Sequence, residues 1–179
     1  MPTTHSLRCT LYYLSLEADY PAGTDGIFRD MQGNVLHTGS HEFLKMAAIE
    51  GSAKLNDGRV LNVAGHAGGE SRWTVVAAPF GLDAIGCPLV PLRSVAVDKS
   101  VIPLRSRIRL DETIGLPMSD GSAHDGIWYA VDVGGGIVGD RIDLFVGAGK
   151  AAMQPVYNFG IGHLKPLTTT ILGTITGCP

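Results

Sequence analysis

Residues 129–147 read YAVDVGGGIVGDRIDLFVG, in which two apolar runs flank a run of glycines. The β-branched, aromatic and other apolar residues on either side of the glycine run are typical of strands, so we predict strands over 127–133 and 141–146. The glycines between them allow a tight turn. An aspartate interrupts each strand, although Asp has poor strand propensity and is rarely buried without a partner. The stretch therefore predicts two neighbouring strands that each carry a carboxyl group.

The same pattern of short strands between turns extends outward along the chain, which contains 24 Gly and 10 Pro. Residues 41–49 (HEFLKMAAI) could form one short helix, and 79–91 is a loop broken by Gly and Pro. Six or more short strands with little helix predict an all-β fold closed into a barrel. The further strands that we predict cover residues 9–16, 73–78, 94–97, 108–110 and 168–176.

Length and composition limit the domain organisation and the function. A chain of 179 residues suits one domain, 1–179, within which 17–72 reads as an elaborated insertion of a few short elements. The net charge of -3 argues against a nucleic-acid partner, because such proteins usually carry a basic excess. No apolar run is long enough to span a bilayer, and the N-terminus shows no recognisable signal peptide.

Three aspartates are the candidates for chemistry: Asp98, Asp132 and Asp143 each lie at or inside an apolar strand signal. Alternate residues of a strand share a face. Asp132 should therefore share a face with Ala130, and Asp143 should face away from Ile142 and Leu144. Each carboxyl could then reach a groove while its neighbours are buried. The plainer interpretation is that these aspartates cap turns beside glycines.

The spacing of these residues resembles the three-aspartate domain of the membrane-bound lytic transglycosylase A family. The central motif is present as Asp132, Gly134, Gly135, Ile137, Gly139, Asp143 and Gly147. Upstream, VAVDKSVIPLRSRIRL is similar to the first aspartate motif of the family, with Asp98, Ile102 and Pro103 in place; downstream, Tyr157, Asn158 and Gly160 resemble a further element. The tyrosine pair in CTLYYLS is a weaker match. The resemblance covers about residues 94–162, and 17–72 matches nothing in the family.

The resemblance implies a six-stranded double-psi β-barrel and a lytic transglycosylase of peptidoglycan. In this reading Asp143 is the acid and then the base, with Asp132 and Asp98 as its partners. The residues that it implies for substrate binding are Tyr13, Lys99, Gly134, Gly135, Tyr157 and Asn158. No cofactor is expected, and the partner is the glycan strand. The site of action would be periplasmic or secreted, and a secreted effector would also meet a cognate inhibitor or immunity protein.

Two other functions remain open at this point. A peptidoglycan amidase could use Cys9 or Cys87 as nucleophile with one of six histidines. A barrel of this kind could also bind glycan or a protein partner without catalysis, since fold does not imply function. His37, His41 and His66 lack any recognised metal-ligand spacing, so no metal is expected.

The three cysteines allow two interpretations. A bridge between Cys9 and Cys178 is conceivable, because chain ends are often close in a domain. The odd count favours three unpaired thiols, and this is our prediction.

Overall fold

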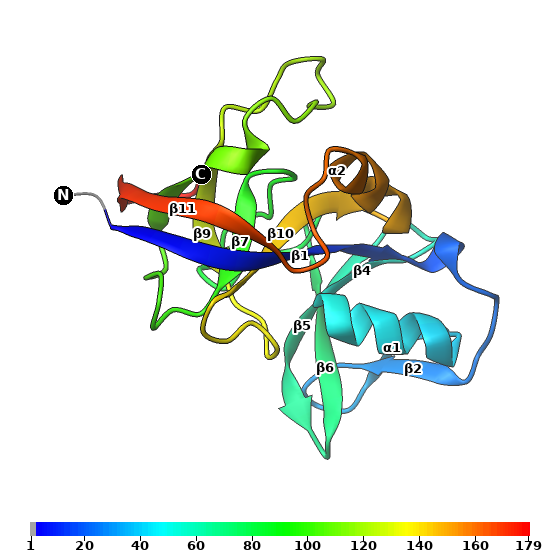
Figure 1. Cartoon of the computed structure of the whole chain (residues 1–179). Coiled ribbons are helices and arrows are strands. Elements are labelled where there is room, and N and C mark those ends of the chain that lie inside the picture. Colours follow the sequence, from blue (N-terminus) through cyan, green and yellow to red (C-terminus); the bar gives the residue numbers. More distant parts are fainter. Residues whose placement is uncertain (1–2) are drawn as a thin grey trace. The chain divides into compact units, whose positions relative to one another are not determined.

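The computed structural model describes residues 3–179, which form eleven β-strands, two α-helices and three short 3₁₀-helices (Figure 1). The strands are β1 (Thr4–Leu16), β2 (Gly26–Arg29), β3 (Val35–Gly39), β4 (Ser52–Lys54), β5 (Val60–Ala67), β6 (Glu70–Val76), β7 (Ser94–Val97), β8 (Ser106–Leu110), β9 (Ile127–Asp132), β10 (Arg141–Ala148) and β11 (Lys165–Thr174). The helices are α1 (His41–Glu50) and α2 (Gln154–Asn158).

The predicted elements agree with these bounds. Every stretch predicted as a strand overlaps one, and 94–97 coincides with β7. The short helix predicted over 41–49 is α1. The insertion over 17–72 is more regular than expected, since it contains α1, the complete strands β2 to β5 and the start of β6.

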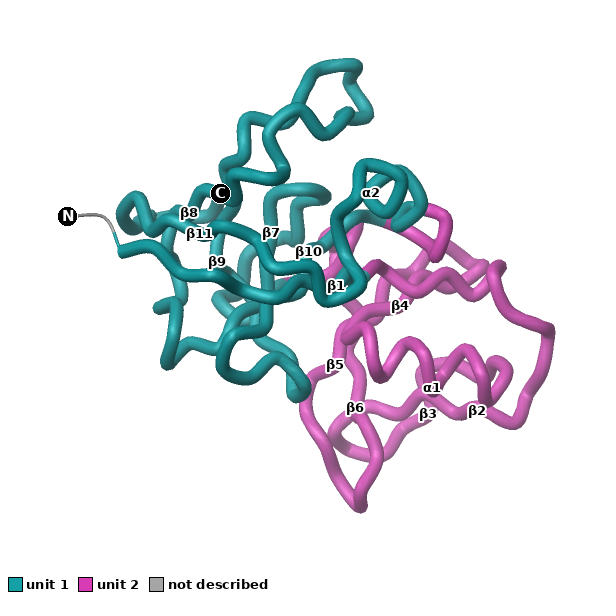
Figure 2. The backbone as a smooth tube through the Cα atoms, viewed as in Figure 1, with its two compact units in different colours: residues 1–12, 83–147, 152–179 teal, residues 13–82, 148–151 magenta. Residues whose placement is uncertain are grey.

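The chain divides into two compact units (Figure 2). Unit 1 contains residues 1–12, 83–147 and 152–179, and unit 2 contains 13–82 and 148–151. The predicted insertion therefore lies within unit 2. The single domain over 1–179 stays a prediction, because a compact unit is defined by packing and a domain by its ability to fold alone.

Unit 1 is built on a closed barrel. Its strands follow the order β10-β7-β9-β8-β11-β1, and pairing between β10 and β1 closes the ring. In Figure 1, β1 in blue and β11 in red run side by side, and they pair antiparallel from Thr4 opposite Thr170 to Cys9 opposite Lys165. Closure leaves no unpaired edge among these strands.

Alternation of side chains fills the barrel. In β8, Ser106, Ile108 and Leu110 are buried while Arg107 and Arg109 are exposed, as a strand with one face toward a core requires. Trp128 of β9 is fully buried, and its indole N–H donates to Thr113 Oγ1 at 2.9 Å. A large ring can thus lie in the interior without an unpaired donor.

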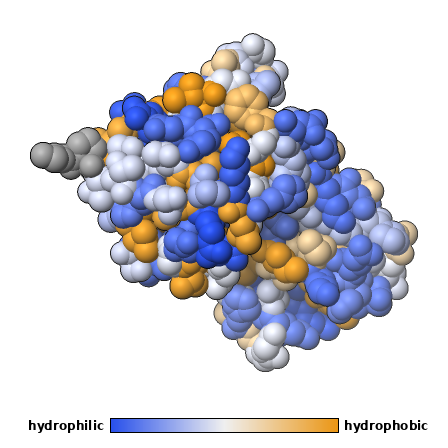
Figure 3. All heavy atoms as spheres, viewed as in Figure 1, coloured by the Kyte–Doolittle hydropathy of each residue, from blue (hydrophilic) through white to orange (hydrophobic). Residues whose placement is uncertain are grey.

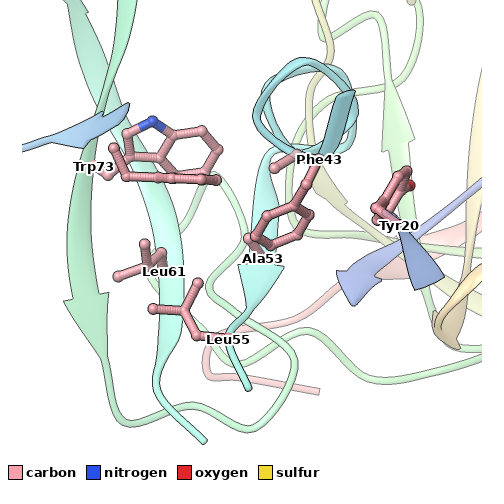
Figure 4. Packing of buried hydrophobic residues seen from close by; sticks show 8 residues of the cluster. Tyr20, Phe43, Ala53, Leu55, Leu61 and Trp73 are labelled. Atoms are coloured by element: carbon pink, nitrogen blue, oxygen red, sulfur yellow. The ribbon is translucent and has the colours of Figure 1, made fainter. Parts of the chain in front are cut away.

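Unit 2 has a core of its own, drawn in Figure 4. Helix α1 begins at Ser40, whose side chain accepts from the Phe43 N–H, and ends at Gly51, whose φ of 86° favours glycine. The helix buries Phe43 in this core, where Phe28 lies between Phe43 and Trp73 with ring centroids 5.2 and 5.0 Å away. The remaining core residues are Tyr20, Ala47, Ala53, Leu55 and Leu61.

The cysteines pair differently from both interpretations of the sequence. Cys87 and Cys178 form a disulfide with their Cα atoms 5.5 Å apart, and Cys9 is free and buried. The Cys9 side chain instead accepts a hydrogen bond from the Gly162 N–H at 3.2 Å. The prediction of three unpaired thiols and the alternative bridge from Cys9 to Cys178 are both wrong. The reason is that Cys9 belongs to a barrel strand and Cys178 to the tail after β11.

Surface polarity varies over short distances. On the face drawn in Figure 3, hydrophobic residues form separate areas among hydrophilic ones. Within residues 3–179, no helix has the length and apolar character needed to cross a bilayer.

Candidate active site in the barrel

The barrel brings Asp132 and Asp143 into one row across three adjacent strands. Asp143 of β10 lies opposite Ala96 of β7, and Ala96 lies opposite Asp132 of β9. Strands are spaced about 4.8 Å apart, so the two aspartate Cα atoms are separated by about 10 Å. Residues of one row project to the same face of a sheet, so both carboxyl groups lie on the face of the small Ala96. Burial raises the pKa of Asp143, and the charge of Asp132 adds to this shift, which agrees with their proximity.

A register shift places Asp132 in that row. Ser94 pairs with Tyr129 and Val95 with Ala130, but the next partner of β7 is Asp132, so Val131 is an extra residue. Such a bulge changes the face on which the following side chain points. Strict alternation, which puts Asp132 on the face of Ala130, therefore does not describe the end of this strand.

Asp132 is held by two hydrogen bonds. The Tyr12 hydroxyl donates to Oδ2 at 2.8 Å, and the Val133 N–H donates to Oδ1 at 2.9 Å. Burial nevertheless raises its pKa to about 6, with a further contribution from the charge of Asp83. Removal of a carboxylate from water disfavours its charged form, and here that effect exceeds the hydrogen bonds.

Asp143 is the less satisfied of the two acids. Its Oδ1 is buried and has no hydrogen-bond partner within the part of the chain that the structure describes. Burial raises the pKa of Asp143 to about 6, opposed by a hydrogen bond from Thr10 and by the charge of Arg141. Arg141 also donates to Thr10 Oγ1 at 3.3 Å, so the two residues act on Asp143 together. A buried, unpaired carboxyl oxygen with a pKa near neutrality is suited to proton transfer.

Asp98 has a different environment. Its Oδ1 accepts from the N–H and the hydroxyl of Ser100, and its Oδ2 accepts from the Gly139 N–H at 2.7 Å. These bonds hold the pKa of Asp98 below its usual range, with the Ser100 hydroxyl as the largest cause. Asp98 is thus an ionised anchor for the β9–β10 loop and is poorly suited to donate a proton.

The tyrosine pair contributes through its first member. Tyr12 lies in unit 1 and contacts Asp132. Tyr13 is 3% exposed in unit 2, where its hydroxyl lies 3.4 Å from that of Tyr20. Tyr12 was not among the predicted site residues, although the alternation of β1 could have identified it, since neighbouring residues of a strand point to opposite faces.

The other predicted substrate residues lie on exposed loops or on α2. Lys99, Gly134, Gly135 and Asn158 are exposed, and Gln154 Nε2 donates to Asn158 Oδ1 at 2.8 Å. Neither Gly134 nor Gly135 has a positive φ. Gly139 in the same loop does, with a φ of 66°.

Tyr157 is partly buried and stacks on His163, with ring centroids 4.2 Å apart. Gly162 beside them has a φ of 109°, and a Cβ there would lie 2.5 Å from Tyr157 Cε1. Glycine at this position therefore allows the tyrosine to pack against the backbone.

The cysteine and metal alternatives do not fit these surroundings. Cys87 is in the disulfide, and burial raises the pKa of the Cys9 thiol, which disfavours the reactive thiolate. The amidase nucleophile that the sequence left open is therefore not available in this state. Across residues 3–179, no group of three or more His, Cys, Asp or Glu is placed to hold a metal ion. His37 instead pairs with Glu17 at 2.7 Å.

Comparison with known proteins agrees with the sequence motif and the barrel. Residues 93–157 match the 3D domain family. No curated protein sequence matches the chain. The fold is similar to E. coli MltA with bound chitohexaose, at a TM-score of 0.66 and 16% identity, over 96% of this chain and 72% of that one.

It is similar also to a membrane-bound lytic murein transglycosylase from Agrobacterium tumefaciens, at a TM-score of 0.63 and 15% identity, over 96% of this chain and 76% of that one. The all-β, six-stranded barrel and the resemblance to the three-aspartate domain, both predicted from the sequence, are confirmed.

Proposed function

We propose that this chain, which carries a 3D domain of the MltA family at residues 93–157, cleaves peptidoglycan glycan strands as a lytic transglycosylase. The bond is the β-1,4 link between N-acetylmuramic acid and N-acetylglucosamine. The observation that carries the proposal is the buried, unpaired Oδ1 of Asp143, in the same row of the barrel as the partly buried Asp132. Similar proteins that bear the name lytic transglycosylase support the substrate class.

In the proposed reaction Asp143 acts as an acid and then as a base. Its carboxyl gives its proton to the glycosidic oxygen as the bond to the muramoyl C1 breaks. The muramoyl C6 hydroxyl then attacks C1, and its proton passes to the Asp143 carboxylate. Asp143 is thereby restored, a 1,6-anhydromuramoyl end is formed, and no water is consumed.

Asp132 keeps the acid protonated. Burial is the main cause that raises the pKa of Asp143, and the charge of an ionised Asp132 nearby adds to it. The pair then shares one proton close to pH 6, and its titration belongs to both groups. Asp98 completes the trio as a positioning residue, because it ties the β9–β10 loop at Gly139.

The proposed place of action is outside the cytoplasm, periplasmic or secreted. Peptidoglycan lies there, and disulfides such as Cys87–Cys178 persist in oxidising compartments. Glycan strands are the proposed partner, through the surface around Lys99, Gly134, Gly135, Tyr157 and Asn158. A cognate inhibitor or immunity protein would be a further partner if the chain is delivered into rival cells.

The test is mass spectrometry of muropeptides after purified sacculi are incubated with the chain in ¹⁸O-labelled water. We expect anhydromuramoyl ends without label. Reducing ends that carry the label would mean hydrolysis by two carboxylates and would refute the lytic mechanism. Intact sacculi after binding would favour a non-catalytic barrel, and released peptides with intact glycan would favour an amidase.

A further inference from the structure

A fourth carboxyl group lies beside the three aspartates of the motif. Asp83 is 7% exposed in the loop that precedes β7. Its Oδ1 accepts from the N–H groups of Ile85 and Cys87 at 3.0 and 2.8 Å, and its own N–H donates to the Cys87 carbonyl at 2.9 Å. Residues 83–87 therefore form a closed turn organised by this side chain.

The turn is fixed against the end of β9. The Ala84 N–H donates to the carbonyl of Val131, the residue before Asp132, at 3.1 Å. The disulfide joins Cys87 to Cys178 in the C-terminal tail. Arg105 ties that tail to the same strand, because its N–H donates to the Ala130 carbonyl at 2.7 Å and its Nη1 to the Gly177 carbonyl at 3.4 Å. The turn, the tail and β9 thus form one clamp.

The turn uses only half of the Asp83 carboxyl group. Oδ2 is buried and has no hydrogen-bond partner within residues 3–179. A turn cap needs one acceptor, which the neutral amide of asparagine also supplies. A buried, unpaired carboxylate oxygen costs stability, so the capping role alone does not account for the charge.

The charge of Asp83 acts on the site. Burial is the main cause that raises the pKa of Asp132 and of Tyr12, whose hydroxyl binds Asp132, and the charge of Asp83 adds to both shifts. Burial raises the pKa of Asp83 itself, opposed by the N–H groups of Cys87 and Ile85 and by the positive charge of Arg105. The ionisable groups that face Asp132 are therefore Tyr12 from β1, Asp83 from the loop and Asp143 from β10.

We propose that Asp83 is a positioning residue of the site, held by the Cys87–Cys178 clamp so that its charge controls the ionisation of Asp132. The consequence for catalysis rests on the function proposed above. The active pair has Asp132 ionised and Asp143 protonated, so protonation of Asp132 sets the acidic limb of the pH–rate profile. Asp83 acts on the acidic limb alone. The alkaline limb reports the ionisation of Asp143, which occurs when Asp132 is already ionised.

The test is the pH–rate profile of Asp83→Asn on sacculi. Asparagine keeps the Oδ1 acceptor of the turn and removes the charge. We expect the acidic limb to move to lower pH by on the order of half a pH unit while the alkaline limb stays in place. The matched control is Asp120→Asn, because Asp120 caps its own exposed turn through Ser122 and should leave both limbs unchanged. A uniform fall in rate with both limbs in place would show that Asp83 only caps the turn and does not control the ionisation of Asp132.

The clamp is tested by the double variant Cys87→Ser with Cys178→Ser. A looser turn should weaken the effect of Asp83, so the acidic limb moves in the same direction. Addition of Asp83→Asn to this variant should then shift the limb by less than it does in the wild type. Equal shifts in both backgrounds would show that the disulfide does not hold Asp83 in place.

A second readout separates this proposal from the proposed function. NMR titration of the Asp132 carboxyl carbon needs no activity, and we expect its apparent pKa to fall in Asp83→Asn. If sacculi are never cleaved and this shift is found, the transglycosylase function fails and the Asp83 coupling holds. An unchanged Asp132 titration refutes the coupling whatever the activity.

Discussion

At the scale of single residues, the two acids of the barrel are distinguished by their hydrogen bonds. Oδ2 of Asp132 is bound by Tyr12 and Oδ1 by the Val133 N–H, whereas Oδ1 of Asp143 is buried without a partner. An acid that must give and retrieve a proton needs a free oxygen at the substrate. Asp143 is therefore the better donor, and Asp132 is the better source of a fixed charge.

Asp143→Asn should abolish glycan cleavage and stabilise the fold at neutral pH. The folded pKa of Asp143 is about 6, above the value of about 3.9 for an unfolded Asp, so its ionisation costs folding free energy as pH rises through this range. Removal of that cost should be worth on the order of 1–3 kcal/mol at pH 7 and nothing at pH 4. Muropeptide analysis and thermal melts at both pH values provide the measurement. Retained cleavage would transfer the acid role to another residue, with Asp132 as the next candidate.

Asp132→Asn should move the alkaline limb of the pH–rate profile, whereas Asp83→Asn should move the acidic limb. Without the charge of Asp132, the pKa of Asp143 falls, so the alkaline limb shifts to lower pH. Initial rates on sacculi from about pH 4 to 8 test this expectation. A uniform loss at every pH would mean that Asp132 positions substrate instead.

At the scale of elements, the β9–β10 loop depends on one glycine and one aspartate. Gly139 has a φ of 66°, a conformation that L side chains rarely adopt, and its N–H donates to Asp98 Oδ2. Gly136 in the same loop lies outside that conformation and has open space around a Cβ. The loop therefore contains a position that needs glycine and a position that tolerates alanine.

Gly139→Ala should destabilise the protein by about 1 kcal/mol and reduce cleavage, because the strained backbone loosens the contact with Asp98. Gly136→Ala is the matched control and should leave both properties close to wild type. Urea unfolding and initial rates on sacculi give the two numbers for each variant. Equal behaviour of the two variants would contradict the anchoring role of Asp98.

The scale of the whole molecule is where the disulfide acts. It joins residues 91 positions apart, and a cross-link of this length restricts the unfolded chain strongly. Reduction should therefore lower the free energy of unfolding by about 2–4 kcal/mol. Urea titrations with and without a reducing agent measure the loss, with the double serine variant as a control that should not respond to reductant. If the free energy of unfolding of the wild type does not respond to the reducing agent either, the disulfide does not stabilise the fold.

Metal removal should have no effect on either folding or activity. No cluster of ligand side chains is formed within residues 3–179, and the proposed reaction is carried by carboxyl groups. Incubation with EDTA, followed by a thermal melt and a rate measurement on sacculi, tests the expectation. Activity that is lost with EDTA and returns with Zn²⁺ or Ca²⁺ would contradict it.

The amino-acid sequence alone predicts the strands, the helix α1 and the three-aspartate motif of the barrel. Those features depend on local patterns: alternation, β-branched residues, turn glycines and the spacing from Asp98 to Gly147. It could not determine the pairing of Cys87 with Cys178, the bulge at Val131 or the contact of Tyr12 with Asp132. Each of these joins residues from separate elements, and only the closure of the barrel sets their distances. Asp83 is the clearest case, because a lone aspartate in a loop gives no local signal, and its effect on Asp132 exists only where the loop packs against β9.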